Sequence, residues 1–512
     1  IVILFIFSAV CFYNSPGNAG AADSRRDLSK KKKDAACSNR GEDFKFDPGS
    51  GPVKRLELDI NQVSSLGLKN NFDIQIFKLD NSIGQEELLK AQNVYDTSLD
   101  FSYKYEENKL KRASTLLGKR TVAVTEDLTL SKQLLSGTVL SLSTAHSRDT
   151  TDSSSSIFNP AHEVSAGVSI TQPLGKNAWG VIDNNTVQIT KLDTANTGYT
   201  SQDKIEIELA NIQKIYWNLL LAQKELELAE EVSESAAQLY KTNKRNFKMG
   251  ILEAPEFYAT EANLKEKQQE LVIAQARFKN ALSALRYRLN LNMDVLITPK
   301  DEFDLKQKQA GFEDMVRTAL AKRRDYKKAK NIIKQKDLYA AMKKSSLWPQ
   351  IDLTASFTRN GLDSRFADSI SEITSEEYPE YTVGVIFSFP LENSAARAEY
   401  SQKQLEQAKA LIGLKKTECL ILVQVHDAFI DLMSRRDSVD LLEQAKELQH
   451  KKYLGEADRF KKGRSDTDRF IRYQNDYLRA KLVYLRSLYK YQEAAIDLKL
   501  ITNTLLEEIV KN

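Results

Sequence analysis

The chain has 512 residues, with 74 basic and 70 acidic side chains and a formal net charge of +4. This near balance gives no electrostatic reason to expect a nucleic-acid partner. The three cysteines, Cys11, Cys37 and Cys419, have no zinc-ligand spacing, so we expect neither a metal site nor a structural disulfide. Beyond the N-terminal region, no segment approaches the 18 consecutive apolar residues of a transmembrane helix.

The first 21 residues resemble a secretory signal peptide. An apolar run from Ile1 to Tyr13 is too short to cross a bilayer and precedes the small-x-small site Ala19-Gly20-Ala21. A buried N-terminal strand is the alternative. Because there is no initiating Met or basic segment, we expect the true start to lie upstream. Val10 precedes Cys11, which argues against a lipid anchor, and we expect residues 22–50, which are polar and charged, to form a disordered leader.

The chain then repeats one unit. Three stretches recur at fixed offsets: Val63, Lys69 and Tyr95 at 253 residues, Gly167 and Pro173-Leu174 at 217, and Tyr216, Phe247 and Gly250 at 213. Internal repetition of this kind indicates duplicated architecture. We therefore predict a first repeat over 51–292, a linker over 293–311, a second repeat over 312–506 and a tail over 507–512.

Each repeat is predicted to run helix, strand, strand, helix, helix. Apolar and polar residues alternate in four stretches: Leu99–Glu106, Val164–Thr171, Ile351–Phe357 and Tyr381–Phe389. Such alternation gives a strand one apolar and one wet face. It fits a soluble sandwich as well as a membrane barrel, so the helices must decide between them.

Two helical patterns are exceptionally long, over 184–249 and 394–462. In the first, apolar residues are spaced 4-3-4-3 at Ile205, Leu209, Ile212, Tyr216 and Leu219, the spacing of a coiled-coil seam. About 66 residues at 1.5 Å each make a rod of roughly 100 Å. The returning helix over 253–291 is too short to pair along all of it, so we expect the helix over 72–94 to pair along the remainder.

Four strands per chain cannot close into a membrane barrel, and open edges are costly in lipid. Three copies would supply twelve strands in a ring, whereas two would supply eight, which side chains fill. The first repeat also holds an extra hairpin, Thr121–Leu130 and Thr138–Thr144. It could enter the wall, giving eighteen strands, or stand above the membrane. We expect residues 112–158 to be an extracellular, dispensable insertion, because the second repeat lacks them and a ring of eighteen strands would be far wider than the helical part below it. Its mixed charges also suit water: Lys119, Arg120, Glu126, Asp127 and Lys132.

The doubled unit, the strand ends SITQPL (Ser169–Leu174) and SFPL (Ser388–Leu391), and two Phe-x-x-Gly turns resemble the TolC-type outer membrane efflux protein family over about residues 56–506. The resemblance implies an α+β membrane protein, a homotrimer whose 12-stranded outer-membrane barrel continues into a long α-helical coiled-coil tunnel in the periplasm. It implies docking to a periplasmic adaptor, or membrane fusion protein, and to an inner-membrane pump of RND or ABC type. From the lack of catalytic motifs in the sequence, we expect no cofactor and no enzymatic activity.

The resemblance also assigns candidate site residues. The adaptor-docking tips would be Met249, Gly250, Ile251, Lys462, Gly463 and Arg464. Ordinary helix-capping glycines are the alternative, and the basic second tip departs from the family's apolar flanks. The tunnel-entrance constriction would involve Asp466, Asp468, Arg469 and Arg472. Here two arginines occupy the usual acidic register, so ion selectivity is open, and a solvated helix face is the alternative.

Other chemistry is not indicated. The four histidines are scattered without metal spacing or a nucleophile, so we predict no catalytic and no metal site. Trp179 and Trp348 flank strands and could anchor at the inner bilayer interface or simply pack. The preferred function is a passive exit channel, for efflux or for type I secretion. A pore-less periplasmic or secreted coiled-coil scaffold is the alternative, but it would not need paired strands at one end.

Overall fold

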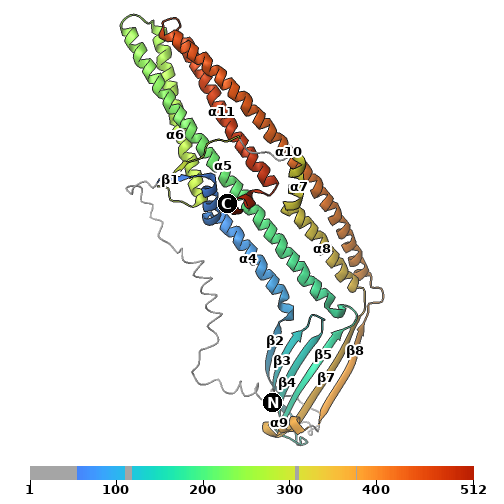
Figure 1. Ribbon diagram of the computed structural model, residues 1–512. Coiled ribbons are helices and arrows are strands. Elements are labelled where there is room, and N and C mark those ends of the chain that lie inside the picture. Colours follow the sequence, from blue (N-terminus) through green and yellow to red (C-terminus); the bar gives the residue numbers. More distant parts are fainter. Residues whose placement is uncertain (1–54, 110–117, 306–310, 376–377, 512) are drawn as a thin grey trace. The chain divides into compact units, whose positions relative to one another are not determined.

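Two helices of 68 residues each, α5 (Val181–Lys248) and α10 (Ser394–Lys461), run the length of the helical part (Figure 1). Each is about 100 Å long at 1.5 Å per residue. This computed structural model describes residues 55–109, 118–305, 311–375 and 378–511. The predicted signal peptide, the leader, Cys11 and Cys37 lie outside the described residues.

The long helices pair with different short helices in their two halves. Near the sheet the contact order is α4 (Phe72–Gln92), α5, α8 (Arg324–Ser345), α10. Away from the sheet it is α6 (Ala254–Leu289), α5, α11 (Thr467–Ile501), α10. Each half is thus a layer of four helices. The predicted pairing of one long helix with two shorter ones is confirmed in both repeats.

Local capping explains where the shorter helices break. The predicted break near Asn70-Asn71 is confirmed: α3 (Ile60–Asn70) ends there, and the Asn71 side chain caps α4 by accepting a 3.0 Å hydrogen bond from the Ile74 N–H. In the second repeat, α7 (Phe312–Lys322) and α8 are likewise separated at Arg323. A last helix, α12, spans Leu505–Lys511.

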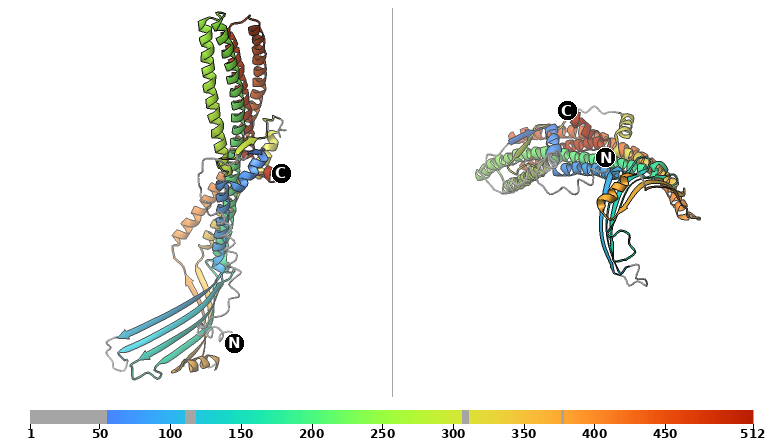
Figure 2. Two further views of the ribbon diagram at one scale, coloured as in Figure 1. Left: turned by 90° about the vertical axis from the view of Figure 1, so that its left-hand side faces the viewer. Right: turned by 90° about the horizontal axis from the view of Figure 1, so that it is seen from below.

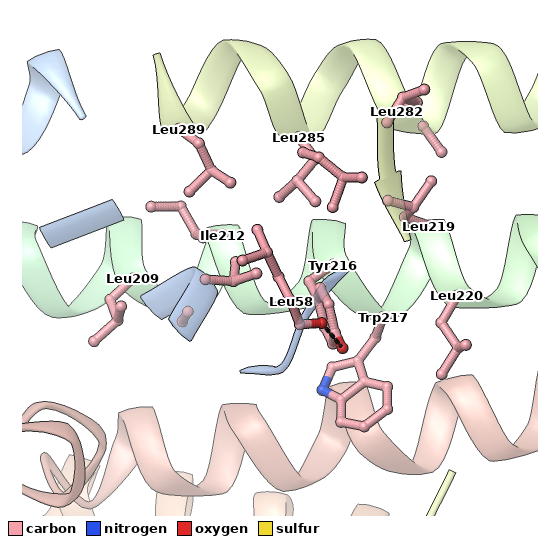
Figure 3. Packing of buried hydrophobic residues seen from close by; sticks show 14 of the residues in the cluster. Leu58, Leu209, Ile212, Tyr216, Trp217, Leu219, Leu220, Leu282, Leu285 and Leu289 are labelled. Atoms are coloured by element: carbon pink, nitrogen blue, oxygen red, sulfur yellow. Dashed lines mark hydrogen bonds between the residues drawn. The ribbon is translucent and has the colours of Figure 1, made fainter. Parts of the chain in front are cut away.

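The main hydrophobic core lies where α5 meets α3 and α6. The seam predicted from the sequence forms it: Leu209, Ile212, Tyr216 and Leu219 are fully buried, and Leu285 and Leu289 of α6 face them (Figure 3). Burial of such side chains stabilises a fold by about 1.5–3 kcal/mol each. The Tyr216 hydroxyl donates to Asp301 Oδ2 at 2.7 Å and lies 3.0 Å from the Leu58 carbonyl oxygen. Burial and the Asp301 carboxylate raise the pKa of Tyr216.

A small parallel sheet completes this core. It pairs β1 (Arg55–Leu58) with β6 (Leu296–Pro299), and Ile297 is fully buried. The stretch expected to be a linker over 293–311 therefore contains a strand that ties the start of the first repeat to its end.

The large sheet contains six strands in the order β2-β3-β4-β5-β7-β8, all antiparallel (Figures 1 and 2). Their bounds are β2 Thr97–Lys109, β3 Arg120–Gln133, β4 Val139–Thr151, β5 Ala161–Pro173, β7 Gln350–Asp363 and β8 Pro379–Ser388. The four alternating stretches predicted as strands correspond to β2, β5, β7 and β8. Short 3-10 turns, η1 (Asn93–Tyr95) and η3 (Ala178–Gly180), join the sheet to α4 and α5.

The expectation that the extra hairpin stands apart from the sheet is wrong. β3 and β4 lie between β2 and β5 and are paired along their lengths, so each chain supplies six strands rather than four. Mixed charges alone do not show that the hairpin lies in water, because it matters where on the strands the charged residues are. Lys119, Arg120 and Lys132 lie at or beside the ends of β3, Asp127 shares a face with small polar residues, and Glu126 has a partner in His146 at 3.4 Å.

Helices α9 (Phe366–Ser375) and α12 were not predicted from the sequence. α9 follows β7 and packs against β5 and β7. Gly361 permits this contact, since a Cβ there would collide with the Ser369 carbonyl oxygen. No helix among the described residues has the length and apolarity needed to cross a bilayer.

Candidate functional site

Both Phe-x-x-Gly turns end a long helix in the same way. Gly250 and Gly463 have φ of 74° and 67°, the left-handed conformation that favours glycine. In the first turn the N–H groups of Gly250 and Ile251 donate to the carbonyls of Phe247 and Asn246 at 3.0 and 2.9 Å. The second turn repeats the pair from Gly463 and Arg464. Both are Schellman motifs, so capping accounts for the glycines themselves.

The phenylalanine of each motif packs on the returning helix. Phe247 stacks on Phe257 with ring centroids 4.9 Å apart, and Phe460 stacks on Phe470 at 4.7 Å. Stacked aromatic pairs contribute about 0.5–1.5 kcal/mol beyond their burial. The four residues keep the 213-residue offset, which explains why the two turns share a sequence.

A buried polar group links the two helical hairpins just behind the tips. Asn243 Nδ2 donates to the Thr260 hydroxyl at 2.9 Å and lies 3.4 Å from that of Thr467, which donates to Glu256 Oε2 at 3.1 Å. Asn243, Thr260 and Thr467 are nearly fully buried. Since buried polar groups are costly unless paired, this network fixes α11 against the first hairpin.

The two tips differ in chemistry. At the first, Met249 and Ile251 are 55% and 72% exposed, so apolar side chains project into solvent. At the second, Lys462 and Arg464 are exposed, and Lys462 pairs with Asp458 at 2.6 Å. A partner that covers both tips must therefore accommodate an apolar and a basic surface.

The predicted constriction residues all lie in the first turns of α11. Asp466 caps the helix, accepting from the Arg469 N–H at 2.7 Å, and this hydrogen bond lowers the pKa of its carboxyl group. Arg472 pairs with Asp468 at 2.6 Å, and the Arg469 and Asp466 side chains are 3.8 Å apart. The four charges are therefore balanced within one helix.

The large sheet has an apolar face and a polar face. One row of residues across all six strands reads Leu99, Leu130, Leu142, Val168, Phe357, Tyr381. The next row, on the other face, reads Asp100, Thr129, Ser143, Gly167, Thr358, Glu380. The hairpin β3–β4 keeps this alternation at Leu128, Leu130, Leu140 and Leu142, while its apolar face also carries Glu126, His146 and Arg148. This separation is what a wall between lipid and water requires.

The polar face is acidic. Its carboxylates are Asp100, Glu106, Asp127, Asp149, Glu163, Asp352 and Glu380, and Lys104 is the single basic side chain on this face of the six described strands. The strand residues on this face are otherwise mainly Ser and Thr. A lumen lined this way would be wet and would attract cations.

Among the residues that the structure describes, the sheet ends in two open edges, β2 and β8. The flanking helices also expose apolar side chains. On α4 these are Phe72, Ile76, Leu79, Ile83 and Leu89, and on α10 they include Leu411, Ile412, Val423 and Ile430. Exposed apolar stripes and unpaired edges on the same two flanks indicate surfaces made for another protein.

The histidines are less scattered than the sequence suggested. His146 Nε2 lies 3.0 Å from His162 Nδ1, and both rings contact Phe366 of α9. His426 and His450 lie elsewhere, against Phe312 and Tyr477. No group of three or more metal-ligating side chains occurs in the part of the chain that the structure describes.

Sequence reasoning missed three features of the site: the acidic lining contributed by β3 and β4, helix α9, and the contact between His146 and His162. The alternation of polar and apolar residues in TVAVTEDLTL could have revealed the acidic residue that β3 contributes. The pairing that brings His146 and His162 together depends on β4 and β5 being neighbours, which no local pattern reveals.

Comparisons with known proteins agree with this geometry. The family model for outer membrane efflux proteins matches residues 139–290 and 315–504, well over half of the chain. Comparison with curated protein sequences gives no match. Among solved structures, the chain is similar to the CmeC outer membrane channel of Campylobacter jejuni, at 16% identity, a TM-score of 0.66 and 88% coverage of both chains.

Two further channels have the same fold. The open-state MtrE channel of Neisseria gonorrhoeae matches at 13% identity and a TM-score of 0.64, covering 91% of this chain and 96% of that one. VceC of Vibrio cholerae matches at 11% identity and a TM-score of 0.63, covering 87% and 95%. At these sequence identities the structural similarity shows only a common fold, and family membership rests on the match to the family model. The chain belongs to the outer membrane efflux protein family.

Proposed function

We propose that three copies of this chain form a passive exit channel in the outer membrane, with the helices enclosing a tunnel in the periplasm. The observation that carries this proposal is the pair of rows across the sheet, one apolar or aromatic at every strand and one polar at every strand except at Gly167. A pore-less scaffold would have no use for a six-stranded sheet with one predominantly polar face.

The proposed ring assembly is based on the exposed side of α4 and on the open edges of β2 and β8. α8 is packed between α5 and α10, whereas its counterpart α4 packs along α5 and exposes its other side. By the internal duplication, the exposed side of α4 fits the α10 of a neighbouring copy. The open β2 edge would meet that neighbour's β8 edge. Such a contact joins different surfaces and closes a ring by rotation, which removes both edges.

The hairpin makes the sheet as wide as the helical layer. Six strands about 4.8 Å apart, tilted by about 40°, span roughly 38 Å of circumference. Four helices about 9–10 Å apart span roughly the same width, whereas four strands would span only about 25 Å. We therefore propose a barrel of eighteen strands in the trimer instead of the twelve that the resemblance implies.

The ends of the assembly have distinct roles in this proposal. Trp179 and Trp348 are 69% and 65% exposed at the helix-proximal end of the sheet, where they would anchor at the inner interface of the outer membrane. The tips at Gly250 and Gly463 would dock to a periplasmic adaptor and, through it, to an inner-membrane pump. Asp466, Asp468, Arg469 and Arg472 would line the entrance.

The proposal is tested by measuring the mass of the purified protein in mild detergent and its conductance in planar bilayers. We expect three chain masses and discrete conductance steps. A monomer without conductance would favour the scaffold. Efflux and type I secretion are distinguished by the pump that restores transport when co-expressed with this chain, an RND pump for efflux and an ABC exporter for protein secretion.

A further inference from the structure

A groove opens on the apolar face of the hairpin, at the ends of β3 and β4 that lie away from the helices. It is lined by Tyr105, Val122 and Val124, with Arg120, Arg148 and Asp152 at its rim. The register places Val124 opposite both Tyr105 and Arg148. The groove thus combines an apolar floor with two guanidinium groups, and Glu107, Glu126 and His146 lie beside it on the same face.

A hydrogen bond at the helix-proximal end of the hairpin shows which end of the sheet holds the groove. The β3–β4 turn lies beside α5, because Asn184 Nδ2 donates to the Leu135 carbonyl at 2.9 Å. The groove is therefore at the opposite end of these 13- and 14-residue strands. A strand of about 9–11 residues crosses a bilayer when tilted, so these ends reach the outer rim of the apolar band.

The rim charges are only partly neutralised. Arg120 Nε donates to Glu107 Oε1 at 2.8 Å. Asp152 is held by the backbone, accepting from the N–H groups of Lys119 and Arg120 at 2.6 and 2.9 Å. The Arg148 guanidinium forms no hydrogen bond or ion pair with any residue that the structure describes, whereas its backbone is paired with β3 and β5.

We propose that this groove binds a phosphorylated lipid of the outer leaflet, with the phosphate between Arg120 and Arg148 and an acyl chain along Val122 and Val124. The inference rests on the proposed function, since it requires the apolar face to meet lipid. Guanidinium groups bind phosphate oxygens through paired hydrogen bonds, and the apolar floor distinguishes a lipid from a free anion. Charge complementarity and position at the band's rim both favour this occupant.

The test uses the full chain in detergent, delipidated and titrated with a phosphorylated acylated glucosamine disaccharide. The same lipid without phosphate and inorganic phosphate are titrated in parallel, with native mass spectrometry as the readout. We expect the phosphorylated lipid to bind about tenfold more tightly than the dephosphorylated one, the ratio that a charged hydrogen bond of about 1.4 kcal/mol gives. Inorganic phosphate should bind no variant measurably.

The variant Arg120→Gln/Arg148→Gln should lose the preference for the phosphorylated lipid. Lys132→Gln is the matched control, because Lys132 is an exposed cation on the same face of β3 at its helix-proximal end. Equal affinity for both lipids, equal loss in the control, or binding of free phosphate alone would overturn the inference. Conductance is measured on every variant, so that failure to form channels is recognised as a failure of the proposed function instead.

Discussion

Replacing Leu128 with lysine tests whether the β3–β4 hairpin belongs to the membrane wall. Leu128 lies on the apolar face of β3, paired with Phe101 and Thr144. A lysine near the bilayer midplane on the lipid face costs about 2–4 kcal/mol. Three chains would therefore lose roughly 6–12 kcal/mol of trimer stability by the same figure. Thr129→Lys changes the next residue, which points to the polar face, and should cost little.

The assay measures folding of each variant into lipid vesicles as a function of denaturant, together with the temperature at which the trimer dissociates on semi-native gels. We expect Leu128→Lys to lower both measures strongly and Thr129→Lys to leave both near wild type. If the hairpin stood in water, both variants would behave alike, within about 0.5 kcal/mol as for other surface substitutions. That result would refute the assignment of β3 and β4 to the wall.

Three other outcomes are expected. Gly250→Ala should cost about 1–2 kcal/mol locally, since its φ is 74°, and faster amide exchange confined to the tip would show it. Lys336 and Lys403 lower the pKa of Glu406 to about 2 from its usual 4.5, so its contribution to the α8–α10 contact is present above pH 4.5 and lost toward pH 2. Glu406→Gln should flatten melting temperature over that range, and a preserved slope would contradict the assignment. Asp127→Asn with Asp149→Asn should shift the reversal potential in a salt gradient toward less cation preference; no shift would place these side chains outside the ion path.

Helix positions could be predicted closely because long repeating patterns average over local noise. The helix expected over 394–462 is α10, Ser394–Lys461. The first long helix was expected over 184–249, and α5 begins three residues earlier, at Val181. The seam through Tyr216 predicted the core because apolar spacing over many turns leaves one solution for packing. The two turns were predictable for a different reason: glycines in the left-handed conformation commonly end helices, and each turn repeats the same Phe-x-x-Gly sequence.

The prediction for the hairpin was wrong because it considered the number of charged residues and not their positions on the strands. A charged residue at a strand end or on the polar face is compatible with a membrane wall, and only register tells which face it occupies. The strands β1 and β6 were missed for a different reason. Each has four residues, and they pair across more than 200 positions of sequence, where no local periodicity signals the contact. α9 was missed because its ten residues lie between two strong strand patterns.

The insertion of β3 and β4 between β2 and β5 shows how such a wall can widen without changing its joints. A hairpin adds two strands, so the chain returns to the side it left, and β2 still runs antiparallel to β5 across the insertion. The outermost strands, which would meet neighbouring copies, are unaffected. In the proposed trimer, the inner strands would therefore set the width of the barrel and the outermost strands would set the subunit contact. Adding or removing one hairpin per chain of that trimer would change the width of the sheet relative to the helical layer, while the order of the outermost strands would stay the same.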